Sequence, residues 1–435
     1  MAAHGTIRLE PAERILGRLS VPGDKSISHR ALLFAAVAGG RSRIRGLSPG
    51  ADVASTRRAV ARLGIAVREE GGDVLVEGSG WRGLDRDPGL PALELDCGNS
   101  GTTARLLLGL LAGRRGRFRL HGDASLSRRP MDRVLRPLAR FGLDPPSATT
   151  LPVEIVGTRL RGARVDAEVP SAQVKGALLL AALQAEGESE IRVPGRSRDH
   201  TERMLAALGA PVRTAGDGRI FRVAGGGADL EPFDLAVPGD PSSAAFFVAL
   251  ACARPGSELV VEGVSLNPTR LGFVRLLRRM GASIEQIPGP ERAIEPAGTL
   301  VARGGRLHGI AIDAGDVADA IDEIPLLAVV AAAADGETVI RGAAELRLKE
   351  SDRIRATAAL LRAAGARAEE FEDGLAVRGG SLRGGGEVDA AGDHRIAMSA
   401  AVAAALAERP LSLRGAEWVS ISYPSFFEDL ARLTR

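Results

Sequence analysis

The sequence predicts an α/β protein of two lobes, with three copies of one small folding unit in each lobe. Six apolar stretches rich in small residues each begin at a polar turn; the turns are at Asp24, Asn99, Ser171, Asp240, Asp322 and Asp393. Successive starts are 75, 72, 69, 82 and 71 residues apart, which is too long for a solenoid repeat and fits a folding unit used six times. A chain of 435 residues is also too long for one hydrophobic core.

Each repeat shows the same order of elements. The Asp, Asn or Ser at its start can accept hydrogen bonds from the free N–H groups of a first helical turn, so the six apolar stretches are predicted to be first helices. A short β-type run follows, as in RIRG and TVIRG, and then an amphipathic second helix. Five of the six second helices end in Gly, as helix C-termini favour, and two more strands follow in most repeats.

The boundaries of the lobes follow from the last repeat. It stops at Arg435 without trailing strands, and we expect TIRLE and GRLSVPG near the N-terminus to supply them. Residues 22–238 then form an N-terminal lobe, and residues 1–21 with 239–435 form a C-terminal lobe. The echo of VPGDKS in VPGDPS marks two crossings between the lobes, with hinges near 21–23 and 237–240.

Composition narrows the class of protein. Two cysteines do not make a disulfide framework, and no spacing typical of metal ligands is present. No signal-like segment opens the chain, and no apolar run approaches the length of about 18 residues that spans a bilayer. We expect a cytoplasmic protein that binds no metal and no membrane.

The cations are placed unusually. Only three of the 57 basic residues are lysines, at Lys25, Lys175 and Lys349, each near the opening of a helical stretch, where a compact ammonium differs from a planar guanidinium. Arg30, Arg105 and Arg395 also lie near the starts of first helices. Helix N-termini bind phosphate and carboxylate, so we expect a cleft between the lobes for a strongly anionic small ligand.

Six motifs in register resemble the 5-enolpyruvylshikimate-3-phosphate synthase family. They are PGDKSISHRALL at 22–33, GNSGTTARLLLG at 98–109, GDASLSRRPM at 122–131, SRDHTERML at 197–205, LKESDRI at 348–354 and GDHRIAM at 392–398. The resemblance implies the enolpyruvyl transferase fold, a two-lobed inside-out α/β barrel of six βαβαββ units, three per lobe. It also implies transfer of the enolpyruvyl group of phosphoenolpyruvate to the 5-hydroxyl of shikimate 3-phosphate, in a monomer without cofactor or metal.

The motifs assign residues to each substrate. Those matched to shikimate 3-phosphate are Lys25, Ser26, Arg30, Ser171, Ala172, Gln173, Ser197, Arg198, Asp322 and Lys349. Those matched to phosphoenolpyruvate are Lys25, Asn99, Gly101, Arg129, Gln173, Arg353 and Arg395. The catalytic residues implied are Asp322, as the group that accepts the 5-hydroxyl proton, and Glu350, as the acid and base at C3 of phosphoenolpyruvate, with Lys25 as a possible partner.

Two features depart from the family pattern or stay open. Many members place a lysine in the last motif, whereas ISYPSFF at 421–427 has none; Lys175 could replace it or could face solvent. His394, next to Arg395, is expected to be structural support rather than a proton carrier. Because Gly101 lacks the methyl group that would crowd glyphosate, a competitor of phosphoenolpyruvate in this family, we expect sensitivity to that inhibitor.

Two alternative functions are weaker. The sister enzyme that acts on UDP-N-acetylglucosamine typically has a reactive Cys before the RP dipeptide, whereas this loop reads GDASLSRRP and Cys97 lies elsewhere. A nucleic-acid-binding protein would need aromatic side chains interleaved with basic ones, and aromatic residues make up only 3% of the chain.

Overall fold

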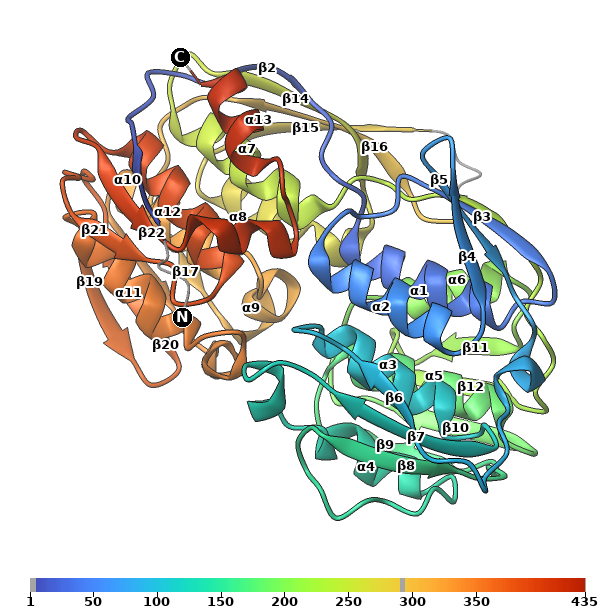
Figure 1. Cartoon of the computed structure of the whole chain (residues 1–435). Coiled ribbons are helices and arrows are strands. Elements are labelled where there is room, and N and C mark those ends of the chain that lie inside the picture. The colour runs from blue at the N-terminus through green and yellow to red at the C-terminus, as the bar shows by residue number, and fades with distance from the viewer. Residues whose placement is uncertain (1–4, 290–293, 435) are drawn as a thin grey trace. The chain divides into compact units, whose positions relative to one another are not determined.

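The computed structural model describes residues 5–289 and 294–434 (Figure 1). The chain forms two compact units, one of Gly23–Val237 and one of Met1–Pro22 with Pro238–Arg435. Among the described residues, none of the helices has the length and apolar character needed to cross a membrane. Each unit contains three repeats, and each repeat has its own small sheet.

The Gly23–Val237 unit contains the first three repeats. The first repeat comprises β13 (Asp234–Ala236), α1 (Lys25–Ala36), β3 (Arg41–Arg45), α2 (Ala51–Arg62), β4 (Ala66–Glu70) and β5 (Asp73–Glu77). The second comprises β6 (Leu93–Asp96), α3 (Gly101–Leu111), β7 (Gly116–His121), α4 (Asp132–Ala139) and β8 (Val153–Gly157). The third comprises β9 (Arg164–Asp166), α5 (Ala172–Gln184), β10 (Glu188–Arg192), α6 (His200–Ala207), β11 (Val212–Ala215) and β12 (Ile220–Ala224).

The second unit contains the other three repeats. The fourth comprises β2 (Leu16–Leu19), α7 (Pro241–Ala253), β14 (Glu258–Ser265), α8 (Gly272–Arg279), β15 (Ser283–Pro288) and β16 (Ala297–Arg303). The fifth comprises β17 (Ala311–Ile312), α9 (Ala314–Ala320), α10 (Ile324–Ala333), β18 (Glu337–Ile340), α11 (Arg353–Ala363), β19 (Arg367–Phe371) and β20 (Gly374–Arg378). The sixth comprises β21 (Glu387–Asp389), α12 (His394–Leu406), β22 (Leu411–Arg414), α13 (Phe426–Leu433) and β1 (Thr6–Leu9).

Every sheet follows one pairing rule. The leading strand of a repeat pairs in parallel with the strand after the first helix, as β6 does with β7, and that strand pairs antiparallel with a trailing strand, as β7 does with β8. The strand after the first helix alternates between buried and exposed residues, and the first helices are buried on nearly every side. The apolar first helices therefore form the interior of each unit and the sheets form its outside (Figure 1).

One part of the expected topology was wrong. The segment TIRLE forms β1 and pairs antiparallel with β22 in the sixth sheet, as expected. The segment GRLSVPG instead forms β2, which pairs in parallel with β14 in the fourth sheet. β13 does the same for β3 in the first sheet. Each crossing strand precedes one first helix in the chain but leads the sheet of another repeat, since β2 precedes α1 and pairs with β14, and β13 precedes α7 and pairs with β3.

Two of the expected helix starts shift, and one helix was missed. The side chains of Asp24, Ser171, Asp240 and Asp393 cap their helices as predicted. Helix α3, however, is capped by Ser100 rather than Asn99, and α10 follows Glu323 rather than Asp322. Asn99 and Asp322 bind arginine side chains instead. The short helix α9, capped by Asp313, was not expected from the pattern.

The first helices approach each other closely at Gly109 and Ala177. A Cβ placed on Gly109 of α3 would lie 2.1 Å from the Ala177 carbonyl oxygen of α5. Because backbone atoms on both sides fix this spacing, Gly109→Ala is expected to lower the free energy of unfolding by about 3 kcal/mol. Urea unfolding would measure it, with Gly305→Ala as the matched control because no heavy atom lies within 4 Å of a Cβ there. Equal stability of the two variants would contradict this packing.

Candidate active site

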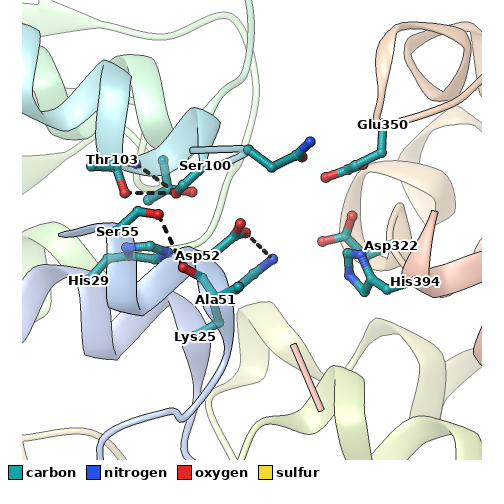
Figure 2. Close-up of polar contacts among 12 residues, drawn as sticks. Lys25, His29, Ala51, Asp52, Ser55, Ser100, Thr103, Asp322, Glu350 and His394 are labelled. Carbon is teal, nitrogen blue, oxygen red and sulfur yellow. Dashed lines mark hydrogen bonds and ion pairs between the residues drawn. The ribbon is translucent and has the colours of Figure 1, made fainter. Parts of the chain in front are cut away.

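The first helix of the chain begins with a lysine held by a partner that the sequence did not reveal. Asp24 accepts from the Ile27 backbone N–H at 2.9 Å and caps α1, whose first residue is Lys25. The Lys25 ammonium donates to Asp52 Oδ2 at 2.9 Å, and Figure 2 shows these two side chains pointing toward one another. Asp52 lies in the first turn of α2, where an acidic residue is common for helix-dipole reasons alone, so its position carried no distinct signal.

Arg30 connects the starts of α1 and α6. Its guanidinium is buried; Nε donates to Thr201 Oγ1 at 2.7 Å and Nη1 to the Ser26 carbonyl at 2.8 Å. Nη2 lies 3.4 Å from the Ala172 carbonyl, at the start of α5. The side chain therefore brings together the predicted Ser26, Ala172 and the turn before α6 that contains Ser197 and Arg198.

Lys175 does not face solvent, which was one of the two expectations for it. Its ammonium is buried within the Gly23–Val237 unit, where it donates to Glu202 Oε1 at 2.6 Å and to the Arg198 carbonyl at 2.9 Å. Burial lowers the pKa of Lys175, and Glu202 opposes that effect. Lys175 thus holds the Ser197–Arg198 turn through the Arg198 carbonyl, and it does not face solvent.

Gln173 and Arg105 connect the starts of α5 and α3. Arg105 Nη1 donates to Gln173 Oε1 at 2.6 Å and Nη2 to the Pro130 carbonyl at 3.0 Å. The Gln173 amide donates in turn to Thr102 Oγ1 at 2.9 Å. Ser171, which begins this turn, accepts from the Val174 N–H and caps α5.

The loop before α3 is held by Arg129. Arg129 Nη2 donates to Asn99 Oδ1 at 2.7 Å, Nη1 donates to the Asn99 carbonyl at 3.3 Å, and the Asn99 amide donates to Asp123 Oδ2 at 2.6 Å. A Cβ on Gly101 would lie 2.8 Å from Arg105 Nη1 and 3.6 Å from Arg129 Nη1. Glycine at this position lets two guanidinium groups approach the first turn of α3.

In the other unit, one arginine holds three carboxylates. Arg353 begins α11 and is 1% exposed. Its Nη1 donates to Asp322 at 3.1 Å, its Nη2 to Glu350 at 2.7 Å, and its Nε to Asp393 at 2.8 Å, with a fourth contact of 3.3 Å from Nη2 to Asp393. These carboxylates raise the pKa of Arg353 against the effect of its burial. The two predicted catalytic carboxylates, Asp322 and Glu350, are therefore fixed on different nitrogens of one guanidinium.

The remaining predicted cations of this unit, Lys349 and Arg395, are close in sequence to carboxylates that bind Arg353. Lys349 directly precedes Glu350, and burial lowers its pKa while Asp322 raises it. Arg395, in the first turn of α12, is buried; its Nη1 donates to the Ser242 carbonyl at 3.3 Å, and its backbone N–H donates to Asp393. His394 is 1% exposed, with Nδ1 4.0 Å from Asp393 Oδ1, and Figure 2 shows it with Asp322 and Glu350.

Neither cysteine is placed for chemistry. Cys97 and Cys252 are fully buried, and burial raises the pKa of each thiol to about 12, so neither is an activated nucleophile. Within residues 5–289 and 294–434, no group of His, Cys, Asp and Glu side chains is arranged to hold a metal ion.

Comparison with known proteins first defines the class. A solved structure of EPSP synthase from Acinetobacter baumannii matches at a TM-score of 0.86 and 39% identity, covering 99% of this chain and 98% of its own. The enolpyruvyl transferase NikO from Streptomyces tendae matches at 0.80 with 22% identity and shows the fold alone. The fold is that of the enolpyruvyl transferases, a two-lobed inside-out α/β barrel with three repeats per lobe.

The sequence comparisons then identify the family. The EPSP synthase (3-phosphoshikimate 1-carboxyvinyltransferase) family matches residues 9–430. The 3-phosphoshikimate 1-carboxyvinyltransferase of Synechococcus sp. (strain RCC307) is 46% identical over 99% of this chain and 100% of its own. That of a strain of Thermus thermophilus is 48% identical over 98% of each. The chain belongs to the EPSP synthase family.

The burial of His29, one helical turn after Lys25, predicts a pH dependence. Burial, with smaller effects of Lys25 and Arg30, lowers the pKa of His29 well below its usual value of 6.5. Below pH 6.5 the unfolded chain therefore binds a proton at His29 that the folded chain does not, so folding is weakened as pH falls through that window. The stability lost through His29 between pH 7.5 and 5.5 is expected to be on the order of 1 kcal/mol.

The measurement is urea unfolding at both pH values, followed by the fluorescence of Trp81, which lies in the same unit as His29. A Trp418→Phe background removes the signal of the other unit. His29→Asn is expected to lose less stability on acidification than the parent chain. Equal losses in both chains would mean that His29 titrates alike in the folded and unfolded states.

Proposed function

We propose that this chain transfers the enolpyruvyl group of phosphoenolpyruvate to the 5-hydroxyl of shikimate 3-phosphate and releases inorganic phosphate. The observation that carries the proposal is the placement of Asp322 and Glu350 on one buried guanidinium, in a chain of the EPSP synthase family. Two acid–base groups at fixed separate positions suit a reaction that moves two protons, one from a hydroxyl and one at carbon.

The helix starts of the Gly23–Val237 unit supply groups for anionic substrates. We assign Lys25, Ser26 and Arg30 to shikimate 3-phosphate, together with the turns Ser171–Gln173 and Ser197–Arg198 and with Asp322 and Lys349. For phosphoenolpyruvate we assign Lys25, Asn99, Gly101, Arg129, Gln173, Arg353 and Arg395. Both substrates contain a phosphate and a carboxylate, so forked arginines and helix N-termini offset the repulsion between them.

The proposed chemistry proceeds by addition and elimination. Glu350 donates a proton to C3 of phosphoenolpyruvate, which gives C2 oxocarbenium character, and Asp322 accepts the proton of the 5-hydroxyl as its oxygen forms a bond to C2. Glu350 then removes a proton from C3, the C2–C3 double bond forms again, and the C2–O bond to phosphate breaks. The departing phosphate takes up the proton that Asp322 received, so both carboxyl groups return to their starting states. No redox step occurs, so the reaction as written consumes no cofactor.

Arg353 couples this chemistry to the binding of phosphoenolpyruvate. As long as its Nη2 donates to Glu350, the positive charge favours the ionised carboxylate, which cannot act as an acid. If Nη2 of Arg353 instead donates to the phosphate or carboxylate of phosphoenolpyruvate, Glu350 loses its cationic partner and has the negative charge of the substrate nearby. Both changes favour the protonated form that the first step requires.

The alternatives are not favoured. The match to the EPSP synthase family over residues 9–430 does not favour the enzyme acting on UDP-N-acetylglucosamine, and the buried Cys97 is not a reactive thiol. No described feature supports binding of nucleic acid. A monomeric state and a cytoplasmic location stay predictions.

The first test is phosphate release from shikimate 3-phosphate and phosphoenolpyruvate, with each omitted in turn. Release should need both substrates, and Lys25→Ala and Glu350→Ala should lower kcat at least about 100-fold, because each removes a charged or proton-transferring group. Glu369→Ala, on the exposed strand β19, is the control and should retain the parent rate. Turnover in the Glu350 variant at the parent rate would remove Glu350 from the mechanism.

Gly101 yields a second test with glyphosate. The parent enzyme should be inhibited in competition with phosphoenolpyruvate. Gly101→Ala should raise the KM for phosphoenolpyruvate and raise the inhibitory concentration of glyphosate at least about tenfold, because the added methyl group, 2.8 Å from Arg105 Nη1, takes up space in the loop assigned to phosphoenolpyruvate and crowds its competitor. The KM for shikimate 3-phosphate is the internal control. A parent enzyme unaffected by glyphosate at concentrations well above that of phosphoenolpyruvate would refute the expected sensitivity.

A further inference from the structure

A buried chain of hydrogen bonds crosses the first three helices of the Gly23–Val237 unit. His29 Nδ1 lies 2.6 Å from Thr56 Oγ1, and Thr56 Oγ1 lies 2.6 Å from Thr103 Oγ1. Thr103 donates to Ser100 Oγ twice, from its hydroxyl at 2.8 Å and from its backbone N–H at 3.1 Å. All four residues are fully buried, and Figure 2 shows the contacts between Ser100 and Thr103.

The Thr103–Ser100 bond at the end of this hydrogen-bond chain determines which atom donates in each of the other bonds. Ser100 Oγ accepts from the Thr103 hydroxyl, so Thr103 Oγ1 must accept from the Thr56 hydroxyl, and Thr56 Oγ1 must accept from Nδ1–H of His29. The lowered pKa of His29 agrees with a neutral ring that has one N–H. Reversal of any one hydroxyl would place two donors or two acceptors face to face.

This chain runs beside the Lys25–Asp52 ion pair. Lys25 and His29 are one turn apart on α1, and Asp52 and Thr56 are one turn apart on α2, so α1 and α2 are joined by two successive contacts. The second contact continues to α3 through Thr103 and ends at Ser100, the N-cap next to Gly101. A Cβ on Gly98, before this cap, would lie 2.7 Å from Ser55 Oγ, so α2 also packs directly against the loop.

Hydroxyl groups are not needed here for packing. Valine has nearly the shape of threonine, and replacing both partners of a buried hydrogen bond by apolar groups of the same shape can be nearly neutral for stability. What valine lacks is a directed bond. A directed chain between helices fixes their rotation and axial position relative to one another, which apolar contacts specify less sharply.

We propose that His29, Thr56 and Thr103 are positioning residues, which fix the Ser100 cap and with it the Asn99–Gly101 loop relative to Lys25. The proposal rests on the proposed function, in which that loop and Lys25 hold phosphoenolpyruvate. None of the three touches substrate. The loop at the end of the chain binds phosphoenolpyruvate, whereas the shikimate 3-phosphate groups at Ser171–Gln173 and Ser197–Arg198 lie on other elements, so the two substrates should respond differently.

The test compares Thr56→Val with Thr56→Ser, which keeps the hydroxyl. In the phosphate-release assay, Thr56→Val should raise the KM for phosphoenolpyruvate about tenfold and change the KM for shikimate 3-phosphate less than about twofold. Thr56→Ser should restore the KM for phosphoenolpyruvate to within about twofold of the parent. Thr103→Val and Thr103→Ser test the same chain at its next member if a Thr56 variant does not fold.

The double variant Thr56→Val with Thr103→Val separates positioning from stability. It removes both partners of the Thr56–Thr103 bond, but it also breaks the Thr103–Ser100 bond and leaves Nδ1–H of His29 without an acceptor, so we expect no gain in stability over Thr56→Val. Because both substitutions interrupt the same chain of hydrogen bonds, the KM for phosphoenolpyruvate should stay raised about as much as in Thr56→Val alone, whatever the urea midpoint of the double variant. A KM that follows the urea midpoint across these variants would overturn the proposal, as would equal changes in both KM values, no change in either, or a serine variant as impaired as the valine one.

Failure of the proposed function gives a different result. A parent chain that releases no phosphate from the two substrates overturns the proposed function, and the positioning role falls with it. A parent chain that releases phosphate, alongside a Thr56→Val variant with parent KM values, overturns only the role of the hydrogen-bond chain.

Discussion

The structure depends on the burial of its first helices on nearly every side. Small residues make this possible: α3 and α5 approach until no room remains for a Cβ at Gly109. The first-turn N–H groups and the last-turn carbonyl groups of such helices lack partners within the helix, so they are the polar backbone atoms that the helices offer to other groups. Lys25, Arg105 and Arg395 all lie within the first two turns of their helices, so these helix starts combine cationic side chains with first-turn N–H groups.

In the second unit, a carboxylate is buried beside the predicted site residues. An isolated carboxylate removed from water costs several kcal/mol, and Asp393 is completely buried. Arg353 offsets that cost and places Asp322 and Glu350 at its edge, where both stay partly exposed. The ion pairs that offset the burial of Asp393 thus also fix the positions of Asp322 and Glu350, the two proposed acid–base groups, on one guanidinium. In the proposed mechanism, a substrate anion that binds Arg353 would change the charge of the whole cluster and thereby affect proton transfer.

Features that depend on contacts between residues close in sequence, such as helix caps, were predictable, whereas contacts between helices were not. Caps such as Asp24 and Ser171 bond to backbone two or three residues away, so the pattern alone reveals them. Asn99 and Asp322 fit the same pattern but bind Arg129 and Arg353, because a charged partner brought by the fold outcompetes a backbone N–H. The Lys25–Asp52 pair and the Thr56–Thr103 contact depend on the register between helices, which no spacing along the chain encodes. The pairing of β2 with β14 in the fourth sheet was not predicted either, because it also depends on contacts between segments far apart in the sequence.

The segment 421–427, which contains no lysine, packs through its aromatic side chains. Tyr423 is buried, its ring centroid lies 5.9 Å from that of Phe247, and its hydroxyl donates to Asp429 at 2.9 Å. Phe426 packs at 5.9 Å against Phe246, over whose ring the Arg395 guanidinium lies at 5.9 Å. The segment therefore contributes an aromatic cluster rather than a charge, and this cluster supports α7 beneath Arg395. Lys175 is paired with Glu202 in the other unit, and the predicted site cations of this unit are Lys349, Arg353 and Arg395.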